Sequence, residues 1–196
     1  MCILIYKPAG VAFTDINTLE KCWDANPDGA GFAVLKNKIH VVKGLMNFDE
    51  FLKAYSALYD KNNDIIIHFR LASKGPVVKE LTHPFVIDKT QPPSLEFITN
   101  KPILFHNGTI PNLGKDGKSD TLEFAELLAK ISENTWDKVI STVRRTDKFI
   151  IAKQGEVKLY GDFEIIDQVY FSNLSWQFNR GINTIKFLEV LYKRKR

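Results

Sequence analysis

The second residue of the chain is a cysteine, Cys2, and it opens a short apolar run, CILIY. Initiator methionine is removed efficiently when the next residue is small, and cysteine is small enough. Removal of Met1 would give Cys2 a free α-amine, whose pKa of ~7.7–8 leaves a useful fraction unprotonated at neutral pH. That amine can accept the thiol proton, so one residue supplies both a nucleophile and its base. The alternative, which a cysteine taken alone favours, is a buried structural thiol.

Two adjacent residues, Asn107 and Gly108, follow another apolar run in the segment ILFHNG. An asparagine amide and a glycine N–H can donate two hydrogen bonds to an oxyanion that develops on a substrate carbonyl. Glycine also lets a substrate approach the backbone closely. Because Asn-Gly is common in turns, a simple turn is the alternative.

Three further residues have the chemistry to bind a small zwitterion. Arg70, in HFRLASKG, stands at the end of an apolar run, and the planar set of N–H donors on its guanidinium suits a carboxylate. Ser73 comes three residues later, at the mouth of a glycine-containing loop, and Asp120 stands in SDT, where it can bind an ammonium group or cap a helix. A salt bridge at the strand end is the alternative for Arg70. Together with Cys2, these residues predict a pocket that holds a free amino acid and attacks its side-chain amide.

The order of these segments resembles one family, the class II glutamine amidotransferases, which are N-terminal-nucleophile hydrolases. The resemblance covers most of the chain. Its motifs are NPDGAGFAV (26–34), HFRLASKG (68–75), THPF (82–85), FHNGTI (105–110) and SDTLEFAELL (119–128), besides the cysteine at position 2. One such motif is weak, but several in the family's order are specific.

The resemblance implies a role for each candidate residue. It makes Cys2, Asn107 and Gly108 catalytic, and it assigns substrate binding to Arg70, Leu71, Ser73 and Asp120, with Arg70 on the α-carboxylate and Asp120 on the α-amine. The chain departs from the family pattern at three positions. Leu71 stands where a tryptophan is common, Lys74 where a histidine is usual, and Ile3 where a glycine usually follows the cysteine. These departures alter the shape of the pocket but remove no catalytic group.

The activity that the resemblance implies is hydrolysis of the side-chain amide of L-glutamine, through a thioester on Cys2, to glutamate and ammonia. It implies neither cofactor nor metal, and a four-layer αββα sandwich of the N-terminal-nucleophile hydrolase type. No synthase, sugar-isomerase or phosphoribosyl domain follows in the sequence, so we expect the ammonia acceptor to be a ligase or transferase on another chain.

Three other interpretations remain open. The first is a non-catalytic protein of the same fold that retains Met1 and binds an amino acid or scaffolds a complex. The second is another cysteine amidase of the N-terminal-nucleophile type, which would not need both Arg70 and Asp120. The third is a metal site built from Cys2, Cys22 and the four histidines, which the spacing disfavours because no two of them are placed as paired ligands.

The elements that must position these residues are a mixture of hairpins and helices, which indicates an α+β domain. Apolar patterning and turn residues predict strands at 2–6, 64–70, 103–108 and 168–173, and hairpins at 30–44 and 148–161. Helices are predicted from Ile16, from Phe48 after an Asn47 cap, over Phe124–Ile131 after a cap at Ser119 or Asp120, and at 135–145. Segments 74–85 and 88–102 are expected to be loops, and 182–192 a helix. We expect residues 1–196 to form a single domain.

Composition limits the class of protein. The chain has 196 residues, 44% of them hydrophobic, and a net charge of +4 that equals the basic tail Lys193–Arg196. A terminal run of charge is usually only solvated, so nucleic-acid binding is not expected. Two cysteines imply no disulfide framework. The N-terminus lacks the pattern of a signal peptide and the apolar runs are of strand length, so we expect a soluble, cytoplasmic protein without a membrane segment.

Overall fold

The structure, a computed structural model, describes residues 1–178. The helices are α1 (Ile16–Ala25), α2 (Phe48–Leu58), α3 (Asp120–Leu128) and α4 (Trp136–Val143), with 3₁₀ turns η1 (Lys79–Leu81), η2 (Glu133–Thr135) and η3 (Ser175–Phe178). The strands are β1 (Ile3–Lys7), β2 (Ala30–Leu35), β3 (Ile39–Leu45), β4 (Asp64–Phe69), β5 (Phe85–Val86), β6 (Glu96–Thr99), β7 (Ile103–Asn107), β8 (Lys148–Lys153), β9 (Glu156–Tyr160), β10 (Glu164–Ile166) and β11 (Val169–Phe171). The helix expected at 182–192 and the basic tail lie outside the described residues.

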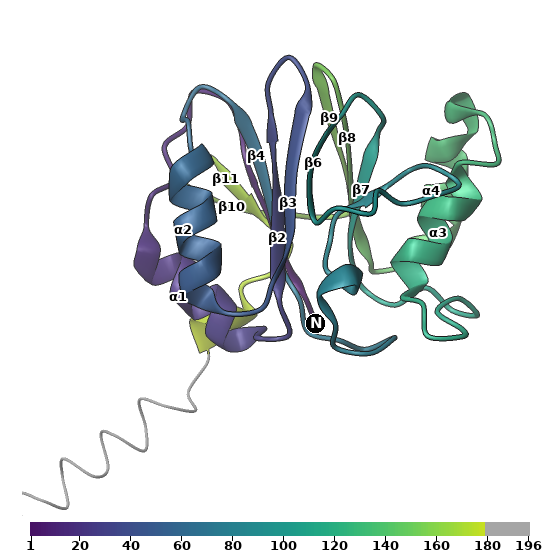
Figure 1. Ribbon diagram of the computed structural model, residues 1–196, viewed down its shortest axis with the longest axis horizontal. Coiled ribbons are helices and arrows are strands. Elements are labelled where there is room, and N and C mark those ends of the chain that lie inside the picture. Colours follow the sequence, from purple (N-terminus) through teal and green to yellow (C-terminus); the bar gives the residue numbers. More distant parts are fainter. Residues whose placement is uncertain (179–196) are drawn as a thin grey trace, which may run out of the picture.

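The strands form two antiparallel sheets. The larger has seven strands in the order β10-β11-β1-β4-β2-β3-β6, and the smaller has four in the order β5-β7-β8-β9. Helices α1 and α2 lie on one side of the molecule and α3 and α4 on the other, with both sheets between them (Figure 1). The mixture of helices and antiparallel sheets confirms the α+β class expected from the sequence.

Buried side chains form three separate groups. The first lies between the larger sheet and helices α1 and α2, and it includes Leu19 and Phe51. The second lies between the smaller sheet and helices α3 and α4, and it includes Phe124 and Ile140. The third contains side chains from both sheets, such as Val41 and Phe105, and joins the inner faces of the two sheets. The central strands of each sheet are therefore covered on both faces.

The central position of β4 in the larger sheet explains why three consecutive isoleucines occur in the sequence. Ile65 and Ile67 point to the group shared with α1 and α2, whereas Ile66 points to the group between the sheets. All three are fully buried. Successive side chains of a strand face opposite ways, so a strand with two covered faces is apolar throughout. The strand predicted at 64–70 is thus confirmed as β4.

The helix starts agree with the capping residues in the sequence. The Asn47 side chain accepts a hydrogen bond from Glu50 N (2.8 Å) at the start of α2, and Ser119 accepts one from Leu122 N (3.1 Å) at the start of α3. Either residue satisfies one of the N–H groups that a helix leaves unpaired at its start. Ser119 is thus the cap of α3, and Asp120 is its first helical residue.

Three strands were not expected from the sequence. The shortest, β5, has only two residues and pairs with β7 in the smaller sheet. β6 lies in segment 88–102, which was expected to be loop, and it pairs with β3 at the edge of the larger sheet. β10 forms a hairpin with β11 through Asp167 and Gln168, both at positive φ (48° and 66°). The sequence has no Asn-Gly or Asp-Gly at this turn, which is the usual signal for it.

Among residues 1–178, no helix combines the length and the apolar character that a bilayer crossing requires.

The core around Phe51 gives a prediction about stability. Phe51 is fully buried, and its ring contacts the rings of Phe32 (6.1 Å between centroids) and Phe69 (4.9 Å). We expect Phe51→Ala to lower the free energy of unfolding by about 3–5 kcal/mol in a urea titration, because it removes apolar contacts and leaves a cavity. Ile98→Ala is the control: Ile98 is 63% exposed, and its loss should cost less than about 0.5 kcal/mol. Equal effects would contradict the core described here.

Candidate active site around Cys2

The pairing of β1 with β4 positions Cys2. Ile3 lies opposite Phe69 in an antiparallel register, so the residue before Ile3 lies beside the residues that follow Phe69. Cys2 Sγ accepts a hydrogen bond from Leu71 N (3.3 Å) and lies 3.4 Å from Leu71 O, to which the thiol donates. The register of two buried strands therefore places the thiol next to the segment that carries Arg70.

The surroundings of the thiol keep it protonated in this form of the chain. Burial raises the pKa of the Cys2 thiol, and the negative charge of Asp120 raises it further. The hydrogen bond from Leu71 N, the charged N-terminus and Arg70 act in the opposite direction but do not outweigh burial. A nucleophilic Cys2 therefore needs a base close to it, which a free α-amine on the same residue would supply.

A cavity of about 390 Å³ opens over the thiol. It is lined by Met1, Cys2, Leu71, Ala72, Ser73, Gly108, Thr109, Arg145, Thr146 and Asp147. Four of the residues singled out from the sequence thus border one cavity, although they come from three separate segments of the chain. The other three, Arg70, Asn107 and Asp120, are buried (3%, 3% and 5% exposed).

Arg70 is held by backbone carbonyls. Its guanidinium donates to Pro76 O (2.9 Å) and Lys74 O (3.2 Å), both in the loop that follows β4. Within residues 1–178 no carboxylate forms a salt bridge with it, so the simple ion pair considered from the sequence is absent there. Asp28 supports the same segment by accepting a hydrogen bond from Ala72 N (2.8 Å). A buried cation without a bridging carboxylate is suited to receive one from a ligand.

Asp120 faces the site from the start of α3. Its Oδ2 accepts from Ile110 N (2.8 Å) and its Oδ1 from Thr121 N (2.8 Å). These contacts tie the carboxylate to the loop that follows Gly108. Among the described residues no lysine or arginine forms a salt bridge with Asp120, although its charge acts on both Cys2 and Arg70.

Asn107 ends β7 and contacts Ser172. Its Nδ2 lies 2.8 Å from Ser172 Oγ, which also lies 2.9 Å from Leu4 N and 3.4 Å from Asn173 Nδ2. A hydroxyl has two lone pairs and one hydrogen, so three donors exceed what Ser172 can accept. With the amide turned over, Ser172 donates to Oδ1, which otherwise is buried without a partner, and Nδ2 becomes the buried atom that has no partner among residues 1–178.

Ser73 connects the two loops that border the cavity. Its hydroxyl lies 3.2 Å from the hydroxyl of Thr109, just after Gly108. Leu71 is 38% exposed and borders the same cavity. The segments after β4 and after β7 are thus joined above the thiol.

Five residues of this site were not predicted from the sequence. Ser172 and Asn173 follow β11, and Asn173 Nδ2 donates to Cys2 O (2.9 Å). Arg145, Thr146 and Asp147 lie between α4 and β8 and border the cavity. The only local signal is the pair of polar residues after an apolar run in YFSN, a pattern that by itself predicts only the end of a strand.

The histidines do not form a ligand set. Among residues 1–178 no group of three or more His, Cys, Asp or Glu side chains is placed to hold a metal ion. His68 and His83 are buried with their rings 3.9 Å apart, and burial lowers the pKa of each well below its usual value. Both are therefore neutral imidazoles in the interior.

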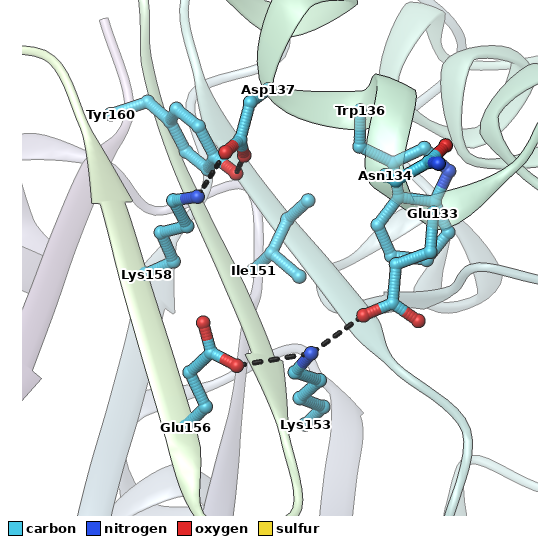
Figure 2. Close-up of a pocket in the computed structure, with 9 residues that line it drawn as sticks. All are labelled: Glu133, Asn134, Trp136, Asp137, Ile151, Lys153, Glu156, Lys158 and Tyr160. Carbon is cyan, nitrogen blue, oxygen red and sulfur yellow. Dashed lines mark hydrogen bonds and ion pairs between the residues drawn. The ribbon is translucent and has the colours of Figure 1, made fainter.

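A second hollow of about 390 Å³ lies over β8 and β9 (Figure 2). Its charged side chains pair with one another: Lys153 lies between Glu133 (2.6 Å) and Glu156 (3.0 Å), and Lys158 contacts Asp137. Because the ammonium groups already have partners and all five charges are well exposed to water, this hollow offers a ligand little electrostatic attraction.

The site around Cys2 is the one that brings the chemically reactive residues together. Comparison of the chain with models of known protein families and with curated proteins found no match.

Proposed function

We propose that this chain is a glutaminase unit of the class II glutamine amidotransferase type, which hydrolyses the side-chain amide of L-glutamine to glutamate and ammonia. One observation carries the proposal: the Cys2 thiol and Gly108 border the same cavity, and the buried charges of Arg70 and Asp120 lie close enough to shift the pKa of that thiol. An enzyme that binds a free amino acid and hydrolyses its side-chain carboxamide requires a nucleophile, an oxyanion donor and two opposite charges.

The arrangement of the sheets supports the same proposal. Two antiparallel sheets joined face to face, each covered outside by a pair of helices, have the layer order of the αββα sandwich of N-terminal-nucleophile hydrolases (Figure 1). We assign the fold to that type as part of this proposal.

The proposed reaction begins with removal of Met1, because the nitrogen of Cys2 is an amide until then. The freed amine takes the thiol proton, and the thiolate attacks the carbonyl carbon of the glutamine side chain. Gly108 N–H and the Asn107 amide stabilise the tetrahedral oxyanion. The amine returns the proton to the leaving nitrogen, ammonia departs, and water then hydrolyses the thioester to glutamate.

Substrate binding rests on charge. Arg70 binds the α-carboxylate with its guanidinium, and Asp120 binds the α-ammonium group. Ser73 and Leu71 border the space that the rest of the substrate occupies. An ammonia-accepting ligase or transferase on another chain would use the product.

A comparison of substrates tests the selection of a free amino acid. We expect wild-type protein to hydrolyse L-glutamine and to reject N-acetyl-L-glutamine by at least about 100-fold in kcat/KM, because acetylation removes the charge that Asp120 binds. Asp120→Asn should reduce kcat/KM for L-glutamine by about 10–100-fold, mainly through KM. Both are measured by glutamate release in a coupled assay.

The control is Asp167→Asn, which changes a carboxylate in the turn between β10 and β11 and should leave the rate unchanged. Equal rates on the free and acetylated substrates would favour a cysteine amidase of another specificity. Absence of hydrolysis by protein shown to lack Met1 would contradict the proposed function.

A further inference from the structure

The loop between α4 and β8 borders the cavity with three consecutive residues, Arg145, Thr146 and Asp147. Arg145 has φ of 44°, in the left-handed region that non-glycine residues seldom adopt. Strained backbone persists where the surrounding structure holds it, and it is concentrated at functional sites. Asp147 is the one carboxylate among the residues that border the cavity, and the mechanism above does not use it.

One oxygen of Asp147 is fixed by two donors. Its Oδ2 accepts from Thr109 N (3.1 Å) and from His106 Nε2 (3.1 Å). The His106 side chain is 1% exposed, and its ring stacks on that of Phe149 at 4.3 Å between centroids. This stacking fixes the plane of the imidazole, in addition to its hydrogen bond with Asp147.

His106 links Asp147 to the start of α3. The Asp147 carboxylate can only accept, so His106 Nε2 donates to it, and His106 Nδ1 lies 2.9 Å from the Thr121 hydroxyl. Thr121 is the second residue of α3 and follows Asp120. A chain of hydrogen bonds therefore joins Asp147 to the helix start that carries the proposed ammonium-binding group.

The other oxygen of Asp147 is free. Among residues 1–178 no hydrogen bond is made by Oδ1, and the side chain is 14% exposed on the wall of the cavity. The carboxylate also lies directly against Gly108: a Cβ at that position would be 2.1 Å from Asp147 Cγ. An acceptor of fixed orientation thus stands beside the proposed oxyanion donor, in the cavity that contains the Cys2 thiol.

We propose that Asp147 is a specificity-determining residue, whose Oδ1 accepts an N–H from the carboxamide of the substrate. This inference rests on the proposed function. A primary amide presents its oxygen to Gly108 N–H and its nitrogen to a neighbouring acceptor, and it has two hydrogens to donate. The product glutamate has no such hydrogen and carries a negative charge, which Asp147 repels. Asp147 therefore favours binding of the amide and release of the acid.

The test compares an amide with an ester. The γ-methyl ester of L-glutamate keeps the carbonyl, the α-carboxylate and the α-amine of glutamine but has no side-chain N–H to donate. For Asp147→Asn we expect kcat/KM for L-glutamine to fall about 10–100-fold, while kcat/KM for the ester changes by less than about threefold. We also expect the inhibition constant of L-glutamate to fall at least about fivefold, because the repulsion is lost.

Asp137→Asn is the matched control, because Asp137 is an exposed carboxylate on α4 that contacts Lys158 and Tyr160 in the other hollow (Figure 2). It should change neither substrate's rate. Circular dichroism and a thermal melt check that both variants fold. An equal loss on amide and ester in Asp147→Asn would overturn the inference, since it would mean that Asp147 only holds the turn at Gly108.

A binding measurement separates this inference from the proposed function. Calorimetry with Cys2→Ala protein compares L-glutamine with L-glutamate, with and without Asp147→Asn. A preference for glutamine that disappears in the double variant supports the role of Asp147 even if the wild-type protein hydrolyses nothing, in which case the proposed function alone fails. Hydrolysis by wild-type protein with a preference untouched by Asp147→Asn overturns this inference alone. If neither compound binds and none is hydrolysed, both fail.

Discussion

Replacing Cys2 with alanine is expected to reduce glutamine hydrolysis by at least about 10⁴-fold, because loss of a catalytic nucleophile leaves only binding and oxyanion stabilisation. Binding of L-glutamine should survive, since Arg70 and Asp120 remain. Glutamate release measures the rate, and calorimetry measures binding.

The other cysteine provides a matched control. Cys22 lies in α1, fully buried in the group of side chains between that helix and the larger sheet. Cys22→Ala is expected to cost some stability and to leave the rate per folded molecule unchanged. Loss of activity in Cys22→Ala and not in Cys2→Ala would contradict the site.

The reactivity of the Cys2 thiol is expected to depend on a free α-amine on Cys2 itself. A chain with a protease-removable extension joined directly to Cys2 gives both forms of one protein. Before cleavage the nitrogen is an amide and hydrolysis should be absent; after cleavage to Cys2 it should appear. Full activity before cleavage would show that another group deprotonates the thiol, and it would remove the basis for an N-terminal nucleophile.

The second large effect is expected at Asn107. Asn107→Ala should lower kcat for L-glutamine about 10²–10³-fold with little change in KM, because an oxyanion donor acts in the transition state and not in the ground state. Loss of the contact with Ser172 should also lower the free energy of unfolding by about 1–3 kcal/mol, so rates are compared per folded molecule.

Asn134→Ala is the control for Asn107. Asn134 is an exposed residue of η2 in the hollow over β8 and β9, and its loss should change nothing (Figure 2). An increase in KM without a decrease in kcat for Asn107→Ala would assign Asn107 to substrate binding, and it would contradict the proposed oxyanion role.

The sequence predicts well the features that depend on neighbouring residues. The buried run of β4, the turn between β8 and β9, and the caps of α2 and α3 each follow from patterns within a few residues. The edge strand β6 was missed because its side chains alternate only between exposed and half-buried and two prolines precede it. An edge strand has no apolar run to reveal it.

The site could be predicted only in part, for the same physical reason. Cys2, Arg70 and Asn107 have side chains that suggest chemistry by type, so the sequence identifies them. Ser172 and Asp147 stand in none of the motifs, and their roles arise from contacts across 65 and 38 residues, with Asn107 and Thr109. Such contacts depend on how the sheets pair, which local pattern does not determine.

Covalent labelling tests the central claim most directly. An analogue of L-glutamine with a diazoketone in place of the carboxamide alkylates a thiolate at the position where the substrate carbonyl is attacked. Intact-mass and peptide analysis should show one label per chain, on the sulfur of Cys2, only in molecules that lack Met1, with L-glutamine protecting against it. Labelling of chains that retain Met1, labelling of Cys22 instead, or no labelling of chains that begin with Cys2 would contradict the account.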